Sequence, residues 1–166
     1  MEIIIRDRNQ ALQEVLDAPK KWAVISIRDP ESGEAPIDKA LHAVQNILVL
    51  EFSDIWDERH ETHGMKLPFG HHVKDALDFA EGKEALLVHC NGGVSRSSAI
   101  AFLVACTLMP PAEAIKMLNK HIHFPNERIV MLGANLMRNR EVLLAFERVF
   151  GEDLFAGLID MENDDE

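Results

Sequence analysis

The segment from residue 85 to residue 109 constrains the fold more than any other part of the sequence. It begins with a short apolar run, Ala85–His89, passes through a glycine-containing loop and continues into a helical stretch, residues 97–109, in which residues 99–106 and 108 are all apolar. An apolar strand without polar alternation is typical of a parallel sheet covered on both faces. A helix that is apolar on every side is buried in the middle of a domain. The segment therefore predicts a central strand–loop–helix unit.

The rest of the chain repeats this alternation of short apolar runs and helical periods. Three further β-rich runs precede the central unit, at residues 3–5, 22–27 and 47–52. Helical spacing of apolar residues occurs at 11–16, 73–80, 112–121 and 127–137. Pro110 and Pro111 end the central helix, and Asn126 is placed to cap the last one. The pattern predicts an α/β fold with three layers, a mainly parallel central sheet of four to five strands and a helical C-terminal half.

Length and composition indicate one globular domain. The chain has 166 residues, of which 47% are hydrophobic, and neither a repeat nor a linker interrupts it. We expect a single domain over residues 1–158. Five of the last seven residues are acidic, which predicts a solvated acidic tail at 159–166.

Charge and cysteine content restrict the compartment and the partners. A formal net charge of −11 argues against nucleic acid or an anionic membrane as a partner. The first ten residues lack the apolar run of a signal peptide, and the mostly apolar stretch 99–109 is about half of the ~20 residues that cross a bilayer. Only two cysteines are present, Cys90 and Cys106, which fits a reducing compartment. We expect a cytoplasmic protein.

The sharpest motif lies between the strand and the buried helix, in the sequence VHCNGGVSRSS at residues 88–98. A short loop that enters a helix can turn its backbone N–H groups inward around one anion, assisted by the helix dipole. Glycines allow the close approach and positive φ that such a loop needs, and an arginine can bind two phosphoryl oxygens at once. The sequence therefore predicts a loop that binds phosphate, or vanadate in its place, formed by Asn91, Gly92, Gly93, Val94, Ser95 and Arg96.

Cys90 stands at the start of this loop, and its chemistry follows from that position. The inward N–H groups, Arg96 and the helix dipole all favour a thiolate over a thiol, and the thiolate is the nucleophilic form. Ser97 is placed to donate a hydrogen bond to the sulfur. We expect His89 to orient the loop rather than act as a base, because an ionised thiolate needs no base.

These residues resemble a known family, the cysteine-dependent protein tyrosine phosphatases, in their compact dual-specificity-like branch. That branch carries a pattern close to V-H-C-x-x-G-x-S-R-S. A second pattern, P-N-x-G-F-x-x-Q, is half present here as Pro125 and Asn126, with Arg128, Ile129 and Leu132 in place of Gly, Phe and Gln. The resemblance covers residues 86–132, and its first motif is matched by Val88, His89, Cys90, Gly93, Ser95, Arg96 and Ser97.

The resemblance implies a two-step hydrolysis without a cofactor. Cys90 attacks phosphorus to give a cysteinyl phosphate, and water then hydrolyses it. The family supplies the proton for the leaving group from an aspartate just past a parallel strand, upstream of the cysteine. Asp54 and Asp57 both fit, in the sequence LEFSDIWDE. We favour Asp54 because it follows the strand directly, while Asp57 follows Trp56 and faintly matches the W-P-D loop of larger tyrosine phosphatases.

The expected substrate is a phosphorylated protein or a small phosphomonoester, bound by a monomer. The chain has no tyrosine and is short, which favours the shallow pocket of the dual-specificity-like branch, with phosphotyrosine as substrate and phosphoserine and phosphothreonine as further candidates. The loop has no lysine, which speaks against phosphoinositides or RNA triphosphates. A non-catalytic phosphate-binding module is the alternative, and a sulfurtransferase or arsenate reductase is a weaker one.

Two other features carry simpler interpretations. His60, His63, His71 and His72 lie close in sequence, but H-E-x-H at 60–63 is one residue short of the H-E-x-x-H zinc motif. We therefore expect a polar loop near the acid and no metal. Cys106 lies too far along the helix to pair with Cys90, so we interpret it as a core residue.

Overall fold

The computed structural model describes residues 1–62 and 64–151, so the acidic tail predicted for 159–166 lies outside the described residues. Strands, α-helices and 3-10 helices (η) alternate along the chain in the following order: β1 Glu2–Arg6, α1 Arg8–Asp17, β2 Ala23–Arg28, η1 Pro36–Ala43, β3 Asn46–Glu51, η2 Glu58–His60, α2 Gly70–Ala80, β4 Ala85–His89, α3 Arg96–Cys106, α4 Pro111–Ala114, η3 Ile115–Met117, α5 Glu127–Met137 and α6 Glu141–Phe150.

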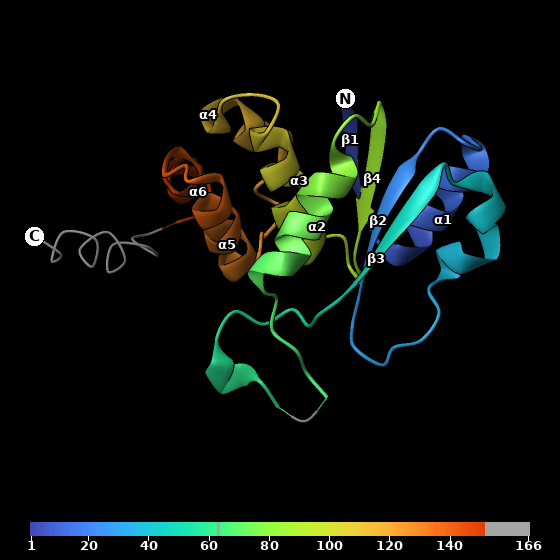
Figure 1. Cartoon of the computed structure of the whole chain (residues 1–166), viewed down its shortest axis with the longest axis horizontal. Helices are drawn as coiled ribbons and strands as arrows, with labels where there is room; N and C mark the ends of the chain where they lie inside the picture. The colour runs from blue at the N-terminus through green and yellow to red at the C-terminus, as the bar shows by residue number, and fades with distance from the viewer. Residues whose placement is uncertain (63, 152–166) are drawn as a thin grey trace, which may run out of the picture.

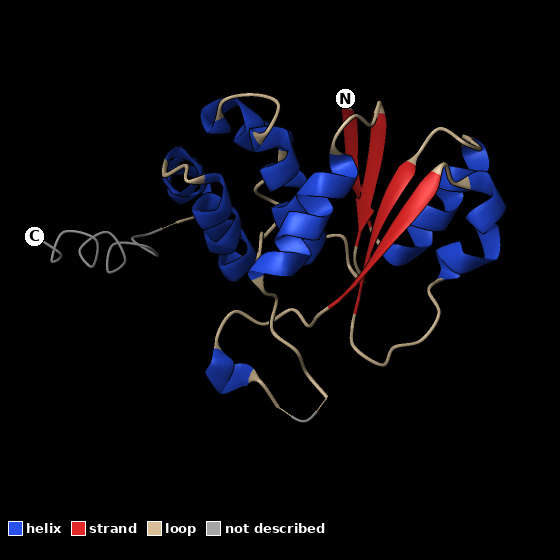
Figure 2. Cartoon of the chain, in the orientation of Figure 1, coloured by secondary structure: helices blue, strands red, loops and turns tan. Residues whose placement is uncertain are grey.

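The central sheet has four strands in the order β1-β4-β2-β3, and every neighbouring pair is parallel. Figure 1 shows α1 and η1 on one face of this sheet and α2, α3, α5 and α6 on the other. Coloured by secondary structure, the strands form the middle layer between two helical layers (Figure 2). The predicted three-layer α/β fold with a parallel sheet is confirmed.

The two faces of the sheet explain why its strands read as continuous apolar runs. Successive side chains of a strand point to opposite faces. In β4, Leu86 and Val88 join the core under α3, whereas Ala85 and Leu87 join the smaller core under α1 and η1. All five residues of β4 are buried, because both faces of this strand are covered.

Helix α3 fills the centre of the larger core, as its composition predicts. Residues 96–105 are all buried, and α5 packs closely against the helix at Gly133. A Cβ on Gly133 would lie 2.3 Å from a methyl carbon of Leu103, so a larger residue here would force the Leu103 side chain to move. The helix ends at Cys106, three residues before the predicted end at Met109, and a turn precedes Pro110.

Two helical predictions need correction. The helix predicted at 112–121 is wrong, because the chain forms only α4 and η3 there and then turns. The N–H of His121 donates to the side chain of Asn119 at 3.0 Å, a local bond that competes with helix continuation. Helix α6 was not predicted, although its buried Val142, Ala145 and Phe146 follow helical spacing.

None of the described helices has the length and apolar composition needed to cross a membrane.

Candidate active site

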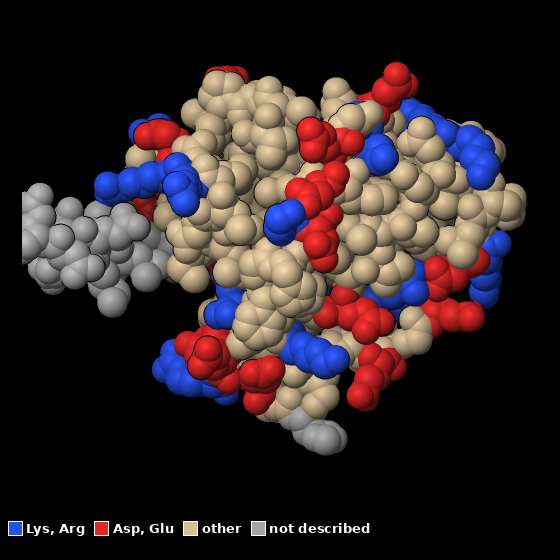
Figure 3. All heavy atoms as spheres, in the orientation of Figure 1, with Lys and Arg blue, Asp and Glu red and all other residues tan. Residues whose placement is uncertain are grey.

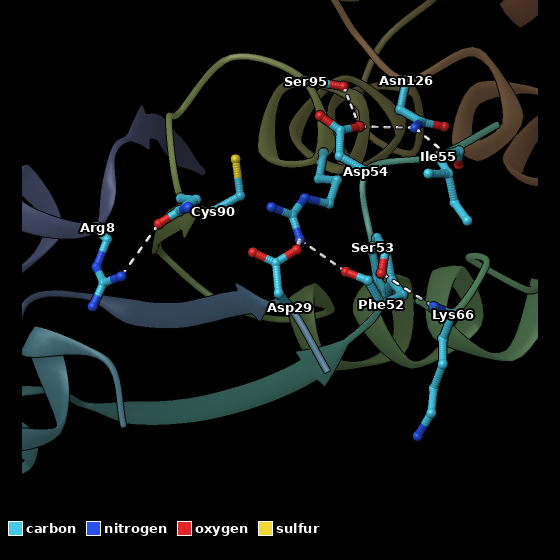
Figure 4. A network of polar contacts seen from close by, with 12 residues as sticks. Arg8, Asp29, Phe52, Ser53, Asp54, Ile55, Lys66, Cys90, Ser95 and Asn126 are labelled. Atoms are coloured by element: carbon cyan, nitrogen blue, oxygen red, sulfur yellow. Dashed lines mark hydrogen bonds and ion pairs between the residues drawn. The ribbon is translucent and has the colours of Figure 1, made fainter. Parts of the chain in front are cut away.

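The site gathers at the edge of the sheet where β2, β3 and β4 end. Asp29 follows β2, Asp54 lies just after β3, and Cys90 follows β4 directly. Figure 4 shows these side chains around the loop that leads into α3. In parallel α/β folds the carboxyl edge of the sheet is the usual ligand-binding edge, so the fold brings the predicted residues to a suitable place.

The loop between β4 and α3 turns its carbonyl groups outward. The carbonyl of Asn91 accepts from the N–H of Arg8, that of Val94 from the N–H of Phe124, and that of Ser95 from the N–H of Asn126, at 3.1 to 3.3 Å. No backbone N–H of residues 92–95 donates to another described residue. A loop with satisfied carbonyls and free N–H groups forms a concave nest that attracts an anion.

Gly93 makes this loop geometry possible. Its φ is +67°, in the left-handed region that favours glycine. A Cβ at this position would lie 2.7 Å from the backbone of both Arg6 and Asp7. The loop therefore packs directly on the junction of β1 and α1, and no other residue type fits there without displacing backbone.

Cys90 is 3% exposed, and its Sγ lies 3.2 Å from the Oγ of Ser97. Ser97 belongs to the first turn of α3 and is fully buried. The hydroxyl is therefore in hydrogen-bond contact with the sulfur, as the sequence predicted. The only other described cysteine, Cys106, is half-buried on α3, and burial raises the pKa of its thiol to about 12.

His89 is buried, and its ring contacts the backbone at the start of the loop. Nδ1 lies 3.3 Å from the carbonyl oxygen of Cys90, while Nε2 is buried without a partner among the described residues. Burial lowers the pKa of His89 to about 4, so the ring is neutral at pH 7. The orienting role expected for His89 stays a prediction.

Arg96 is held rigidly by two acceptors on other segments. Its side chain is 4% exposed, and Nη1 donates to Oδ1 of Asp29 at 2.9 Å and to the carbonyl of Phe52 at 2.8 Å. Nε is buried and has no partner within the described part of the chain. An unpaired buried N–H on a charged group is costly, so this arrangement suits an anion that accepts from Nε.

Asp54 is tied to the loop through a single carboxylate oxygen. Oδ1 accepts from the Oγ of Ser95 at 2.7 Å and from Nδ2 of Asn126 at 2.9 Å. Asn126 also caps α5, as predicted, because its Oδ1 accepts from the N–H of Ile129. Asn126, which belongs to the half-present second motif, thus links the loop after β3 to α5, a contact that the sequence did not reveal.

Asp57 has a different environment. Its carboxylate accepts from the backbone and side chain of Arg59, two residues along the chain. These hydrogen bonds hold the pKa of Asp57 well below its ordinary value. Of these two aspartates, Asp54 is the one that is hydrogen-bonded to the loop between β4 and α3.

Two contributors to the site were missed by the sequence analysis. Asp29 positions Arg96, and Arg8 brings a cation beside the loop, where its Nη1 donates to Oδ1 of Asn91 at 3.3 Å. Arg8, Asp29 and Cys90 line a small hollow of about 50 Å³ together with Ser32 and Glu34. Both residues come from separate elements far away in sequence, so no local motif could have indicated them.

The histidine-rich segment packs against itself. The rings of His71 and His72 lie 3.9 Å apart, and Nδ1 of His72 accepts from the N–H of Phe69 at the start of α2. His63 lies outside the described residues. Within residues 1–62 and 64–151, no three histidine, cysteine or acidic side chains gather as a metal site would require.

No protein-family model and no curated protein matches this sequence. Solved structures with a similar fold do exist. PTPMT1 in complex with PI(5)P is 16% identical, with a TM-score of 0.55 over 89% of this chain and 94% of that one. Human DUSP28 is 18% identical, with a TM-score of 0.55 over 86% of this chain and 94% of that one. DUSP15 is 16% identical, with a TM-score of 0.55 over 90% of this chain and 94% of that one. The chain therefore has the fold of the dual-specificity-like protein tyrosine phosphatases.

Proposed function

We propose that this protein is a phosphatase that hydrolyses phosphotyrosine, and also phosphoserine and phosphothreonine, through a phosphate ester of Cys90. One observation carries the proposal. A buried thiol, a nest of free backbone N–H groups and the unpaired buried Nε of Arg96 lie in and around one loop at the carboxyl edge of the sheet. The similar structures are phosphatases of this class, which supports the same assignment at the level of the fold.

In the first step the N–H groups of residues 92–95 and Nε of Arg96 bind the phosphoryl oxygens. Sγ of Cys90 attacks phosphorus, and the bond from phosphorus to the ester oxygen breaks. Asp54 gives its proton to the departing oxygen. Since Oδ1 of Asp54 already accepts two hydrogen bonds, we assign that proton to Oδ2.

In the second step water attacks the phosphorus of the cysteinyl phosphate. The carboxylate of Asp54, now ionised, accepts a proton from that water, and the bond between phosphorus and sulfur breaks. The sulfur leaves as a thiolate, which the Oγ of Ser97 stabilises from 3.2 Å. The products are inorganic phosphate and the starting enzyme, so no cofactor is consumed.

The non-catalytic alternative uses fewer of these residues. A phosphate-binding module needs the nest and Arg96, but it needs neither a hydroxyl 3.2 Å from a buried thiol nor an aspartate bonded to the loop.

The complex of PTPMT1 with PI(5)P supports a phosphate monoester as the general substrate class.

The proposal is tested with p-nitrophenyl phosphate on reduced protein between pH 5 and 8. We expect hydrolysis by the wild type, inhibition by vanadate, and no hydrolysis by Cys90→Ser, whereas Cys106→Ser stays active. A folded, reduced wild-type protein that binds phosphate and shows no turnover would establish the binding module instead.

A further inference from the structure

An apolar groove begins where the phosphate loop meets Asp54. Its inner end is formed by Ser95 and Asn126, the same two residues that donate to the carboxylate of Asp54. The groove has a volume of about 330 Å³ and continues over apolar side chains from the loop after β3, the turn before α5 and helix α6, namely Trp56, Phe124, Phe146, Val149 and Phe150.

Several of these side chains are unusually exposed for their size. Phe124 is 62% exposed, Trp56 56% and Val149 37%. The phosphate loop uses only the backbone of Phe124, whose N–H donates to the carbonyl of Val94. Exposed aromatic and aliphatic residues that gather in one hollow mark an interaction site.

The position of the groove determines which part of a substrate reaches it. The oxygen that leaves phosphorus must lie beside Asp54, so the alcohol attached to that oxygen begins at the inner end of the groove. The hollow that Arg8, Asp29 and Cys90 line is small, at about 50 Å³, and four charged side chains border it. Of these two spaces, only the groove has the size and the apolar lining for a large side chain.

Charge narrows the choice of substrate further. The groove contains one cation, Lys120, and one anion, Glu127, so its own charges offset each other and attract neither an acidic nor a basic neighbour. The whole chain carries a net charge of −11, and Figure 3 shows acidic side chains over α2 at the centre of one face. Such a protein is repelled by anionic membrane surfaces, which disfavours a lipid within a bilayer.

We propose that the groove binds a large apolar side chain next to the phosphorylated residue of a protein substrate. The inference rests on the proposed phosphatase function and adds the substrate class. Burying a leucine-sized side chain in such a groove should raise kcat/KM about tenfold over alanine. An acidic residue at the same position should lower it below alanine, because its charge loses water against an apolar wall.

The test compares phosphotyrosine peptides that differ only in the two residues flanking the phosphotyrosine, with leucine, alanine or aspartate on either side. p-Nitrophenyl phosphate is the reference substrate, because it has no group that extends along the groove. Phe124→Ala and Val149→Ser alter the groove, and Leu16→Ala is the matched control, since Leu16 is an exposed apolar residue on α1. Thermal unfolding confirms that each variant is folded.

We expect wild type and Leu16→Ala to prefer leucine about tenfold on one side of the phosphotyrosine. Phe124→Ala and Val149→Ser should lose most of that preference while keeping their rate on p-nitrophenyl phosphate. A wild type that hydrolyses p-nitrophenyl phosphate but treats all peptides alike overturns this inference and leaves the phosphatase function intact. A groove variant that loses activity only on vesicles of phosphatidylcholine with phosphatidylinositol phosphate also overturns it. Absence of turnover on every substrate overturns both.

Discussion

Nη1 of Arg96 donates a hydrogen bond to Oδ1 of Asp29 at 2.9 Å, although the two residues are 67 positions apart. Asp29 follows β2, and Arg96 begins α3, which follows β4. Since β2 and β4 are neighbours in the sheet, the bond connects the segments that leave two adjacent strands. With the carbonyl of Phe52 on the same nitrogen, it fixes the guanidinium while Nε stays unpaired. Asp29 therefore acts as a positioning residue for the group that is proposed to bind phosphate.

Replacing Asp29 should weaken the binding of anions at the site and leave the stability of the fold almost unchanged. We expect Asp29→Ala to raise the inhibition constant for vanadate and the KM for p-nitrophenyl phosphate about tenfold, the usual loss for a hydrogen bond to a charged group. Asp29→Asn keeps an acceptor oxygen and should recover part of the loss. Since the Asp29 side chain is 44% exposed, the unfolding temperature should change little. Unchanged vanadate inhibition in Asp29→Ala would show that Arg96 needs no such support.

The two candidate acids can be separated by the leaving group. Asp54→Asn should lose 10²- to 10⁴-fold in kcat on a phenyl phosphate with a poor leaving group, the usual contribution of a general acid. It should lose far less on an activated aryl phosphate, whose oxygen needs no proton. Asp57→Asn should stay close to wild type on both, because Asp57 is hydrogen-bonded to Arg59 and not to the loop. A loss of rate confined to Asp57→Asn would reverse the assignment.

Ser97 should matter most in the second step. Its hydroxyl lies 3.2 Å from Sγ, where it stabilises the thiolate that leaves phosphorus. We expect Ser97→Ala to slow hydrolysis of the cysteinyl phosphate about tenfold, and the formation of that intermediate much less. Stopped-flow measurement should then show a burst of p-nitrophenol followed by slow turnover. A variant without a burst, in which both steps slow equally, would contradict this role.

The two cysteines should differ sharply in reactivity. Burial raises the pKa of Cys106 to about 12, so its thiol stays protonated at pH 7. Iodoacetate, which reacts with thiolates, should therefore alkylate Cys90 alone, and bound vanadate should protect it. Peptide mapping by mass spectrometry checks both results. Alkylation of Cys106 in the folded protein, with Cys90 unmodified, would contradict this prediction.

Burial of His89 should make the stability of the fold depend on pH. The pKa of His89 is lowered from 6.5 to about 4, so below pH 6.5 the unfolded chain binds a proton that the folded protein excludes. Stability is therefore full above pH 6.5 and falls as the pH drops toward 4, by about 2 kcal/mol between pH 7 and 5. His72 has a similarly lowered pKa, so urea unfolding is best compared in His72→Gln with and without His89→Gln. If the free energy of unfolding changes equally with pH in the two proteins, His89 contributes nothing to the pH dependence of stability.

Sequence periodicity predicted the architecture because burial on both faces leaves a clear signal. Strands β2 and β4 consist almost wholly of buried residues, and α3 is apolar all round, so their positions in the middle layer and in the core follow from composition. Where local hydrogen bonds competed with helical spacing, as at Asn119 after η3, periodicity was misleading.

The site was predictable to the extent that it is local. Residues 89–97 form one continuous segment, from the end of β4 through the loop to the start of α3, and their chemistry can be inferred from their order. Asp29, Arg8 and the link from Asn126 to Asp54 depend on how distant elements pack, and none of them has a spacing that a sequence pattern could reveal. The apolar groove also depends on how distant elements pack, since its walls come from four separate segments of the chain.

The central claim is that Cys90 becomes covalently phosphorylated during turnover, and mass spectrometry of the peptides after a rapid acid quench tests it most directly. The protein is mixed with p-nitrophenyl phosphate, quenched in acid within milliseconds and digested, with Cys90→Ser and Cys106→Ser treated alike. We predict a gain of one phosphoryl group on Cys90 in wild type and Cys106→Ser, more abundant in Ser97→Ala, and none in Cys90→Ser. Turnover by proteins that keep Cys90, with no phosphoryl group found on that residue in any of them, would contradict the mechanism. Turnover by Cys90→Ser would contradict it as well.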